Sequence, residues 1–237
     1  SVEPPSIWRI FMTKNFQILV YVDASNYCNT LAFQLAGMGT RMWEIKVTQY
    51  SCEFSNLAPS GCLQYYYGVN AGQDNQQMPL TDGTVESFNF AGKIHLANQN
   101  QNICIRRELN RCRICYSAAA MMFDVSSNAA DDMGIAGKSG SCCGYGKDGM
   151  GTNGYDCVII PGASKGTANK MDVQASEFCG RQLATAALGE AKPAATVCSM
   201  VVPFQIRFLS DSFEFAGKES AKNPDGFKID YKQIACV

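Results

Sequence analysis

Residues 226–236, GFKIDYKQIAC, decide the fold expected for this chain, because a similar stretch lies near the other end. Residues 43–52 read WEIKVTQYSC and align without a gap with residues 227–236, so that an isoleucine, a glutamine and the final cysteine coincide. Both copies alternate with the period of two that a half-buried strand requires. We therefore expect two equivalent antiparallel strands, each of which closes a β-domain.

The spacing of the two copies predicts the domain organisation. A complete domain fits between them, whereas the residues up to the first cysteine are too few to bury an independent core. The expected division is residues 1–52 as the C-terminal strands of a first, incomplete domain, 53–61 as a linker containing Pro59 and Gly61, and 62–237 as a second domain with long loop insertions. The chain is thus expected to begin inside its first domain.

Composition favours an all-β fold and argues against several classes of function. Charged residues make up only 17% of the chain, while glycine, aromatic residues and cysteine are frequent, which suits short strands and long loops. The 20 basic and 21 acidic side chains give a net charge of -1, so we expect no nucleic acid as a partner. No apolar run approaches the ~18 residues of a membrane-spanning helix, so we expect no membrane span.

Runs with strand character recur along the chain and predict an antiparallel sandwich. The run at residues 103–116 is interpreted as a hairpin that turns within residues 108–110. The full set of predicted strands is 16–22, 31–35, 41–50, 62–67, 84–90, the two arms of 103–116, 121–125, 155–160, 197–202, 204–209 and 227–234.

Twelve cysteines in polar loops and at strand ends indicate about six disulfides and an oxidising compartment. A zinc site is disfavoured, because the Cys112-x-x-Cys115 pair has no second such pair and His95 is the single histidine of the chain. In the expected hairpin, Cys104 faces Cys115 if the turn has two residues and Cys112 if it has three. Both pairings are open on this reasoning.

Longer motifs carry a resemblance to a known family. They are YDCVIIPGAS from Tyr155, FCG from Phe178, PFQIRFLSD from Pro203 and GFKIDY from Gly226. Together they resemble the second half of a CUB domain, an extracellular antiparallel jelly-roll β-sandwich. Further stretches, GCLQYYYG, GTVESFNF and HLANQNQNICIRRELNRC, are similar to an arthropod group of secreted CUB-containing proteins. The resemblance covers most of residues 15–236 and implies a secreted protein with CUB domains in tandem.

The resemblance also implies particular cysteine pairs. One is a bond from Cys142 or Cys143 to Cys179, and another joins Cys104 to Cys112.

Two further cysteines, Cys115 and Cys157, stand where the family usually carries other residues. We therefore expect their partners to be particular to this protein. The remaining expected pairs are Cys157 with Cys198, and Cys52 with Cys62, with Cys236 as a competitor for Cys62.

A calcium site at one end of the sandwich is a further implication of the resemblance. In the family, one glutamate and two aspartates converge there. Asp156 and Asp211 match the two aspartates, and Asp124 is the nearest candidate for the glutamate. Carboxylate oxygens at loop mouths suit a cation that takes about six to eight oxygen ligands. The alternative is that Asp156 and Asp211 accept backbone N–H bonds at turns. No other cofactor is expected.

Four arginines crowd the segment around the expected turn. One interpretation is a patch for anionic glycans or an acidic partner protein. The other, which we favour, is a solvated hairpin in which Glu108 neutralises part of the positive charge. The four residues are Arg106, Arg107, Arg111 and Arg113.

No motif in the sequence gives His95 a catalytic partner, since nucleophile-elbow, metalloprotease and nucleotide-binding signatures are absent. The run Tyr65–Tyr66–Tyr67 offers an aromatic contact surface, although strand alternation places at least one of the three in the core. We therefore expect a secreted protein without enzymatic activity that binds an extracellular protein or copies of itself. The alternatives are the regulatory part of a CUB-bearing secreted protease and a glycan-binding protein.

Overall fold

The structure, a computed structural model, describes the chain in sixteen stretches. All regular elements with assigned bounds in these stretches are β-strands, as the composition predicts. The described residues are 6–12, 16–22, 43–54, 56–67, 69–71, 77–79, 81–90, 95–96, 98–119, 121–125, 142–143, 156–165, 176–180, 183, 196–210 and 226–236.

The first sheet of a two-sheet sandwich is organised around β16 (Gly226–Ala235), the strand quoted at the outset. Strands β9 (Arg111–Ser117) and β10 (Phe123–Asp124) pair with one side of β16, and β7 (Asp82–Glu86) pairs with the other. Burial alternates along β16, as the sequence period predicts. Beyond β9, the sheet continues with β14 (Thr196–Ser199) and β12 (Ser164–Lys165).

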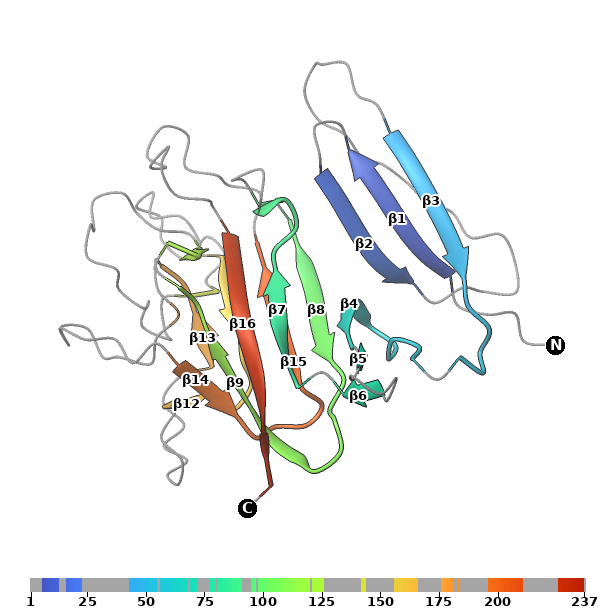
Figure 1. The fold of residues 1–237 in the computed structure, drawn as a ribbon. Coiled ribbons are helices and arrows are strands. Elements are labelled where there is room, and N and C mark those ends of the chain that lie inside the picture. Colours follow the sequence, from blue (N-terminus) through green and yellow to red (C-terminus); the bar gives the residue numbers. More distant parts are fainter. Residues whose placement is uncertain are drawn as a thin grey trace, which may run out of the picture.

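The second sheet faces the first (Figure 1) and has the order β13-β11-β15-β8-β4. Its pairings are antiparallel except for the one between β4 and β8. The strands are β4 (Cys62–Tyr66), β8 (Asn100–Ile105), β11 (Cys157–Ile159), β13 (Glu177–Phe178) and β15 (Gln205–Leu209).

Apolar side chains from both sheets form one core. Phe208 of β15 and Phe227 of β16 meet edge-on across the sandwich, with ring centroids 5.2 Å apart. Ile103, Ile206 and Ile229 are each fully buried in the same cluster. Burial of each such side chain stabilises the fold by about 1.5–3 kcal/mol. This core confirms an all-β, two-sheet architecture, while the jelly-roll order of connections stays a prediction.

The predicted hairpin at residues 103–116 was wrong. Its two arms are strands, as expected, but β8 belongs to the second sheet and β9 to the first. Residues 106–110 therefore cross from one sheet to the other, and we call this segment the crossing loop. Strand alternation shows which residues face inward but does not show which strands pair, and this explains the error.

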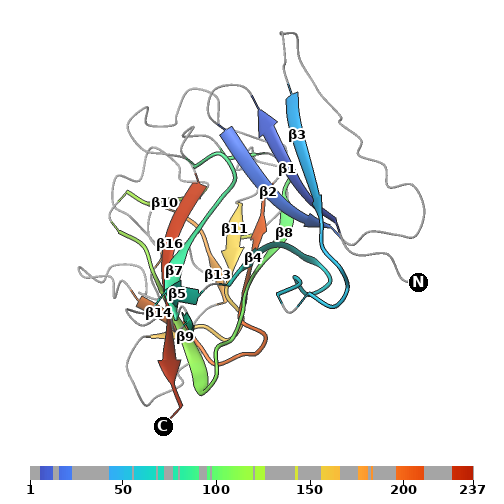
Figure 2. The ribbon, with the colours of Figure 1, turned by 45° about the vertical axis from the view of Figure 1, so that its right-hand side comes forward.

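A separate three-stranded sheet precedes the sandwich, in the order β2-β1-β3. The predicted strands at 16–22 and 41–50 correspond to β2 (Phe16–Val22) and β3 (Trp43–Gln49), whereas β1 (Ser6–Met12) was not predicted. The predicted strand at 31–35 lies outside the described residues. Strand β2 lies beside β4 of the sandwich (Figures 1 and 2). A short pair, β5 (Val69–Ala71) and β6 (Gln77–Pro79), follows β4.

The two strands with similar sequences have different surroundings. In the described part of the chain β3 pairs only with β1, and Ile45 and Val47 are 37% and 43% exposed. The corresponding residues of β16, Ile229 and Tyr231, are buried in the sandwich. The equivalence of the two segments as closing strands of tandem domains therefore stays a prediction.

Two disulfides replace the pairings expected from a hairpin. Cys62 of β4 bonds to Cys104 of β8, and Cys112 at the start of β9 bonds to Cys236, next to the end of β16. The pairings of Cys104 with Cys112 or with Cys115 were wrong, because β8 and β9 lie in different sheets.

A third disulfide joins Cys115 of β9 to Cys198 of β14, which lie directly opposite each other with their Cα atoms 4.0 Å apart. The predicted bond between Cys157 and Cys198 was wrong, because the two cysteines lie in different sheets. Cys157 lies on β11 of the second sheet, whereas Cys198 lies in the first.

The adjacent Cys142 and Cys143 fasten their segment to the second sheet. Cys142 bonds to Cys179, one of the two pairings that the resemblance implied, and Cys143 bonds to Cys157. These cysteines form a small buried cluster with Ile159 and Leu209.

Cys52 is exposed and lies beyond the end of β3. Cys62 is bonded to Cys104, and Cys236 is bonded to Cys112. The expected bonds of Cys62 with Cys52 or with Cys236 were therefore wrong.

Candidate interaction site

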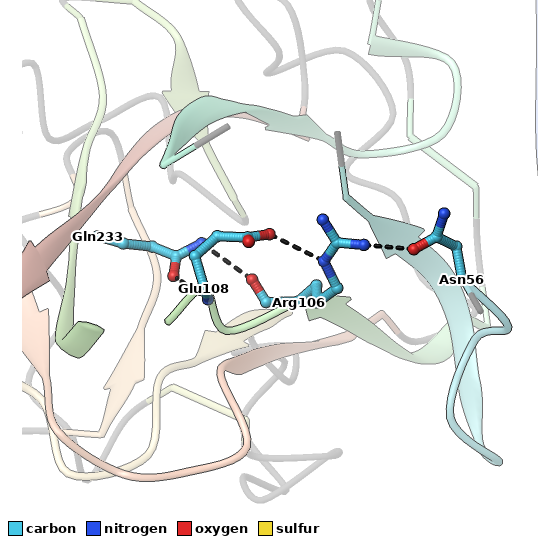
Figure 3. A network of polar contacts seen from close by, with 4 residues as sticks. All are labelled: Asn56, Arg106, Glu108 and Gln233. Carbon is cyan, nitrogen blue, oxygen red and sulfur yellow. Dashed lines mark hydrogen bonds and ion pairs between the residues drawn. The ribbon is translucent and has the colours of Figure 1, made fainter. Parts of the chain in front are cut away.

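The crossing loop is held to the first sheet by the amide of Gln233, a β16 residue whose side chain is only 2% exposed. The backbone N–H of Glu108 donates to Gln233 Oε1 at 2.9 Å, and Gln233 Nε2 donates to the carbonyl oxygen of Arg106, also at 2.9 Å. Figure 3 shows the amide facing the loop. One buried side chain therefore satisfies two backbone groups of a segment that lies outside the assigned strands.

Arg106 is used inside the molecule and does not contribute to an open basic patch. Its Nε lies 2.8 Å from Glu108 Oε1, and a terminal nitrogen donates to Oδ1 of Asn56 in the predicted linker (Figure 3). Its guanidinium carbon also lies 5.6 Å from the centroid of the Tyr67 ring. Arg106 thus joins the crossing loop to the segment that connects the two parts of the chain.

The exposed tip of the crossing loop is Leu109, which is 88% exposed. The next residue is fixed to the end of β16, because Cys236 N donates to Asn110 O at 2.9 Å. The Cys112–Cys236 disulfide fastens the same place covalently. A large apolar side chain is therefore presented to solvent on a loop that is anchored at both ends.

Only one of the four arginines named from the sequence is exposed. Arg107 is exposed two residues before Leu109, and its guanidinium donates to Arg111 O and Cys112 Sγ, whereas Arg111 and Arg113 are partly buried on β9. The crossing loop thus carries one exposed apolar side chain and one exposed cation.

The three consecutive tyrosines separate as strand alternation predicts. Tyr66 packs against the core, and its hydroxyl donates to Gln64 Oε1 at 2.7 Å. Burial raises the pKa of Tyr66 to about 12. Tyr65 lies on the other face, with its ring 5.2 Å from that of Tyr67 and 6.2 Å from that of Tyr21 on β2. Tyr65 is thus covered by the N-terminal sheet.

His95 and Asp156 form a buried polar pair that the sequence did not indicate. His95 Nε2 lies 2.8 Å from Asp156 Oδ2, and the two side chains are 1% and 3% exposed. The His95 ring also meets Phe208 edge-on, with centroids 5.7 Å apart. Asp124 is buried on β10, where its backbone pairs with that of Gly226.

The described residues do not assemble the calcium ligands that the resemblance implied. Among them, no group of three or more histidine, cysteine, aspartate or glutamate residues could hold a metal ion. One oxygen of Asp156 faces a histidine nitrogen, and nitrogen is not a ligand that calcium prefers. Asp211, the third candidate, lies outside the described residues. Calcium binding therefore stays a prediction.

The site residues that sequence reasoning missed are buried polar groups. Gln233 aligns with Gln49 in the repeated stretch, but the alignment assigned it no contact. A polar residue at a core position of a strand was the available signal, since a buried amide requires hydrogen-bond partners.

Two facing sheets, one apolar core and disulfides within and beside the sheets define a disulfide-stabilised β-sandwich. The family model described as the animal CUB domain matches residues 59–234, and the chain belongs to this family. CUB domains are in general extracellular interaction modules without catalysis.

A comparison with curated proteins gave no match to this chain. In the part of the chain that the structure describes, no helix has the length and apolar character needed to cross a bilayer.

Proposed function

We propose that this protein is secreted and binds another extracellular protein through the crossing loop. The observation that carries the proposal is Leu109, 88% exposed on a loop whose neighbours are fixed by hydrogen bonds and a disulfide. A preorganised apolar side chain enters a pocket at little conformational cost, because its loop loses little freedom on binding.

The charge beside the anchor indicates the kind of partner. Arg107 is exposed two residues before Leu109 on the same loop, while Arg106 is paired with Glu108. The complementary surface is therefore an apolar pocket with an acidic group at its rim. The proposed action is binding alone, in an oxidising compartment that maintains the disulfides.

Site-specific photo-crosslinking tests this proposal. A photoreactive amino acid replaces Leu109 in one variant and Lys228, an exposed residue of β16, in a matched control. Each variant is incubated with extracellular fluid from the source tissue. We expect a crosslinked partner from position 109 that is absent from position 228 and is competed by unlabelled protein. Equal crosslinking at both positions, or none at position 109, would overturn the proposal.

We also propose that residues 1–52 supply strands of a further CUB-like unit, that 53–61 connect it to the sandwich, and that the sandwich domain extends over 62–237. The register between residues 43–52 and 227–236 supports this division. Because a domain folds on its own core, we expect residues 62–237 produced alone to form the same disulfides and to give the same circular dichroism as in the full chain. Loss of folding on removal of residues 1–61 would count against the division.

A further inference from the structure

A cavity of about 480 Å³ lies between the N-terminal sheet and the sandwich. Its walls come from the ends of β2 and β3, from the connecting segment, and from β4 and β8. Cavities of about 300–1,000 Å³ are the size that holds small organic ligands, and they are common where two parts of a protein meet. The position and the size of this cavity therefore suit a small molecule.

Much of the cavity wall is apolar and is fixed by packing outside the cavity. The Tyr21 ring meets Tyr65 edge-on with centroids 6.2 Å apart, and the Tyr50 ring stacks on Phe54 with centroids 4.7 Å apart. These two lining tyrosines contribute ring surface in set positions. The aliphatic residues of the lining are Val22, Leu57, Ala58, Pro59 and Leu63.

Two asparagines of the lining are each bound by a guanidinium group. A terminal nitrogen of Arg106 donates to Asn56 Oδ1 (Figure 3), and Arg207 Nε donates to Asn100 Oδ1 at 2.9 Å. Because a guanidinium carries only donors, it is the amide oxygen of each asparagine that faces the arginine. The N–H groups of both amides are the groups left for a ligand, and a bond to a cation makes them stronger donors.

The charge beside the cavity is positive. Arg106 is paired with Glu108 at 2.8 Å, whereas Arg207 has no carboxylate partner among the described residues. Arg207 lies opposite Asn102 in the register of β15 and β8 and bonds to Asn100, so its guanidinium lies beside the β8 part of the lining. The described lining contains no acidic side chain. A negatively charged group on a ligand would therefore find donors and a countercharge here.

We propose that this cavity binds an organic carboxylate, that is, an apolar body of aromatic or aliphatic character with one carboxylate group. The apolar body suits the tyrosine rings and the aliphatic wall. The carboxylate accepts from the amide N–H of Asn100 and interacts with the charge of Arg207 beside it. Such a group belongs either to a free acid or to the C-terminus of a peptide. The cavity does not include Leu109, so this proposal and the proposed protein interaction can fail independently.

The first test is titration of the full chain at neutral pH with acids and their amides, followed by NMR. The acids are phenylpropionate, hydroxyphenylacetate and octanoate, and each amide has the same shape without the charge. We expect at least one acid to bind, and its amide to bind about tenfold more weakly or less. In a ¹⁵N-labelled sample, the bound acid shifts the side-chain amide signal of Asn100. No binding of any acid, equal binding of acid and amide, or shifts confined to residues outside the lining would overturn the proposal.

Substitutions of Arg207 make the test specific to its charge. In Arg207→Gln we expect the preference for the acid over its amide to fall below about threefold, and in Arg207→Lys we expect it to be retained. Lys232→Gln is the control, because it removes the same charge from an exposed position on β16 in the other sheet. Circular dichroism of the three variants verifies folding. An unchanged preference in folded Arg207→Gln, or an equal loss in Lys232→Gln, would contradict the assignment.

A short peptide distinguishes a free acid from the end of a chain. The probe is acetyl-glycyl-glycyl-phenylalanine, with its C-terminus either free or amidated. Binding of the free-acid peptide that phenylpropionate competes identifies a chain terminus as a ligand, whereas binding of small acids alone identifies a free acid. Peptide binding that survives amidation, or that the small acid does not compete, would count against the proposal.

Discussion

At the scale of single residues, the buried amide of Gln233 fixes the position of the crossing loop. This amide links β16 to the crossing loop, which lies between β8 and β9. The stabilisation does not lie mainly in two hydrogen bonds, which are worth about 1 kcal/mol each. It lies in the cost of leaving two buried backbone groups without partners when the amide is removed.

Replacement of this amide tests that argument. Gln233→Leu keeps the side-chain volume but leaves Glu108 N and Arg106 O without their partner, so we expect the free energy of unfolding to fall by about 2–4 kcal/mol. Urea unfolding with the disulfides intact measures the change. Lys232→Ala, at the exposed neighbouring position, is the control and is expected to cost less than about 0.5 kcal/mol. Equal effects of the two substitutions would refute the role of Gln233.

Two buried tyrosines make a contrasting pair. The Tyr66 hydroxyl donates to Gln64, whereas the Tyr116 hydroxyl is buried with no hydrogen-bond partner among the described residues. We expect Tyr66→Phe to destabilise the fold by about 0.5–1.5 kcal/mol, and Tyr116→Phe to be neutral or stabilising. Thermal unfolding of the two variants beside the parent protein measures both. The reverse order would be inconsistent with the hydrogen bonds described above.

The burial of Tyr66 predicts how the stability of the fold changes at alkaline pH. The pKa of Tyr66 is raised in the folded state from 10.0 to about 12, so the folded protein binds this proton more tightly than the unfolded chain does. The contribution to stability is complete below pH 10.0 and is lost as the pH rises to about 12. We expect urea midpoints to fall over this range, and to fall less in Tyr66→Phe. An identical fall in both proteins would show that Tyr66 is not responsible.

At the scale of elements, the crossing loop and the disulfide beneath it act as one unit. The Cys112–Cys236 bond joins the start of β9 to the end of β16, immediately beside the hydrogen bond from Cys236 N to Asn110 O. The position of Leu109 therefore depends on strands that are distant in sequence. This is the element on which the proposed protein interaction depends.

Removal of that disulfide should loosen the loop specifically. In the double variant Cys112→Ala/Cys236→Ala we expect a loss of about 2–5 kcal/mol of stability and faster amide hydrogen exchange in residues 106–111. The double variant Cys143→Ala/Cys157→Ala removes a bond on the second sheet and is the control. We expect it to leave exchange in the crossing loop unchanged. Mass spectrometry of the exchanged peptides measures the exchange in both variants. Equal acceleration of exchange in residues 106–111 would contradict a local role of the Cys112–Cys236 disulfide.

The positions of the strands could be predicted from the sequence, whereas the pairing of the strands could not. The period of two placed Phe227 and Ile229 inside and Lys228 outside, as the structure has them. The partner of a strand depends on where the chain travels between strands. Residues 106–110 fit a tight turn and a crossing between sheets equally well, so the disulfides inferred from the turn were wrong while the two strands themselves were correct.

At the scale of the whole molecule, residues 59–234 form a CUB domain whose two sheets enclose one core. The repeated stretch and the family motifs predicted this architecture, because a pattern distributed over many residues survives local errors. The cavity and the His95–Asp156 pair could not be predicted, because each brings together residues that are distant in sequence. Neither has a local motif that would reveal it.

Peptide mapping under non-reducing conditions tests the central claim most directly, namely that a CUB sandwich fastened by a specific set of disulfides presents the crossing loop in an oxidising compartment. The map requires fragmentation between Cys142 and Cys143. We predict five linked pairs: Cys62–Cys104, Cys112–Cys236, Cys115–Cys198, Cys142–Cys179 and Cys143–Cys157. A bond between Cys104 and Cys112 or between Cys157 and Cys198, or these cysteines recovered as free thiols from the secreted protein, would contradict it.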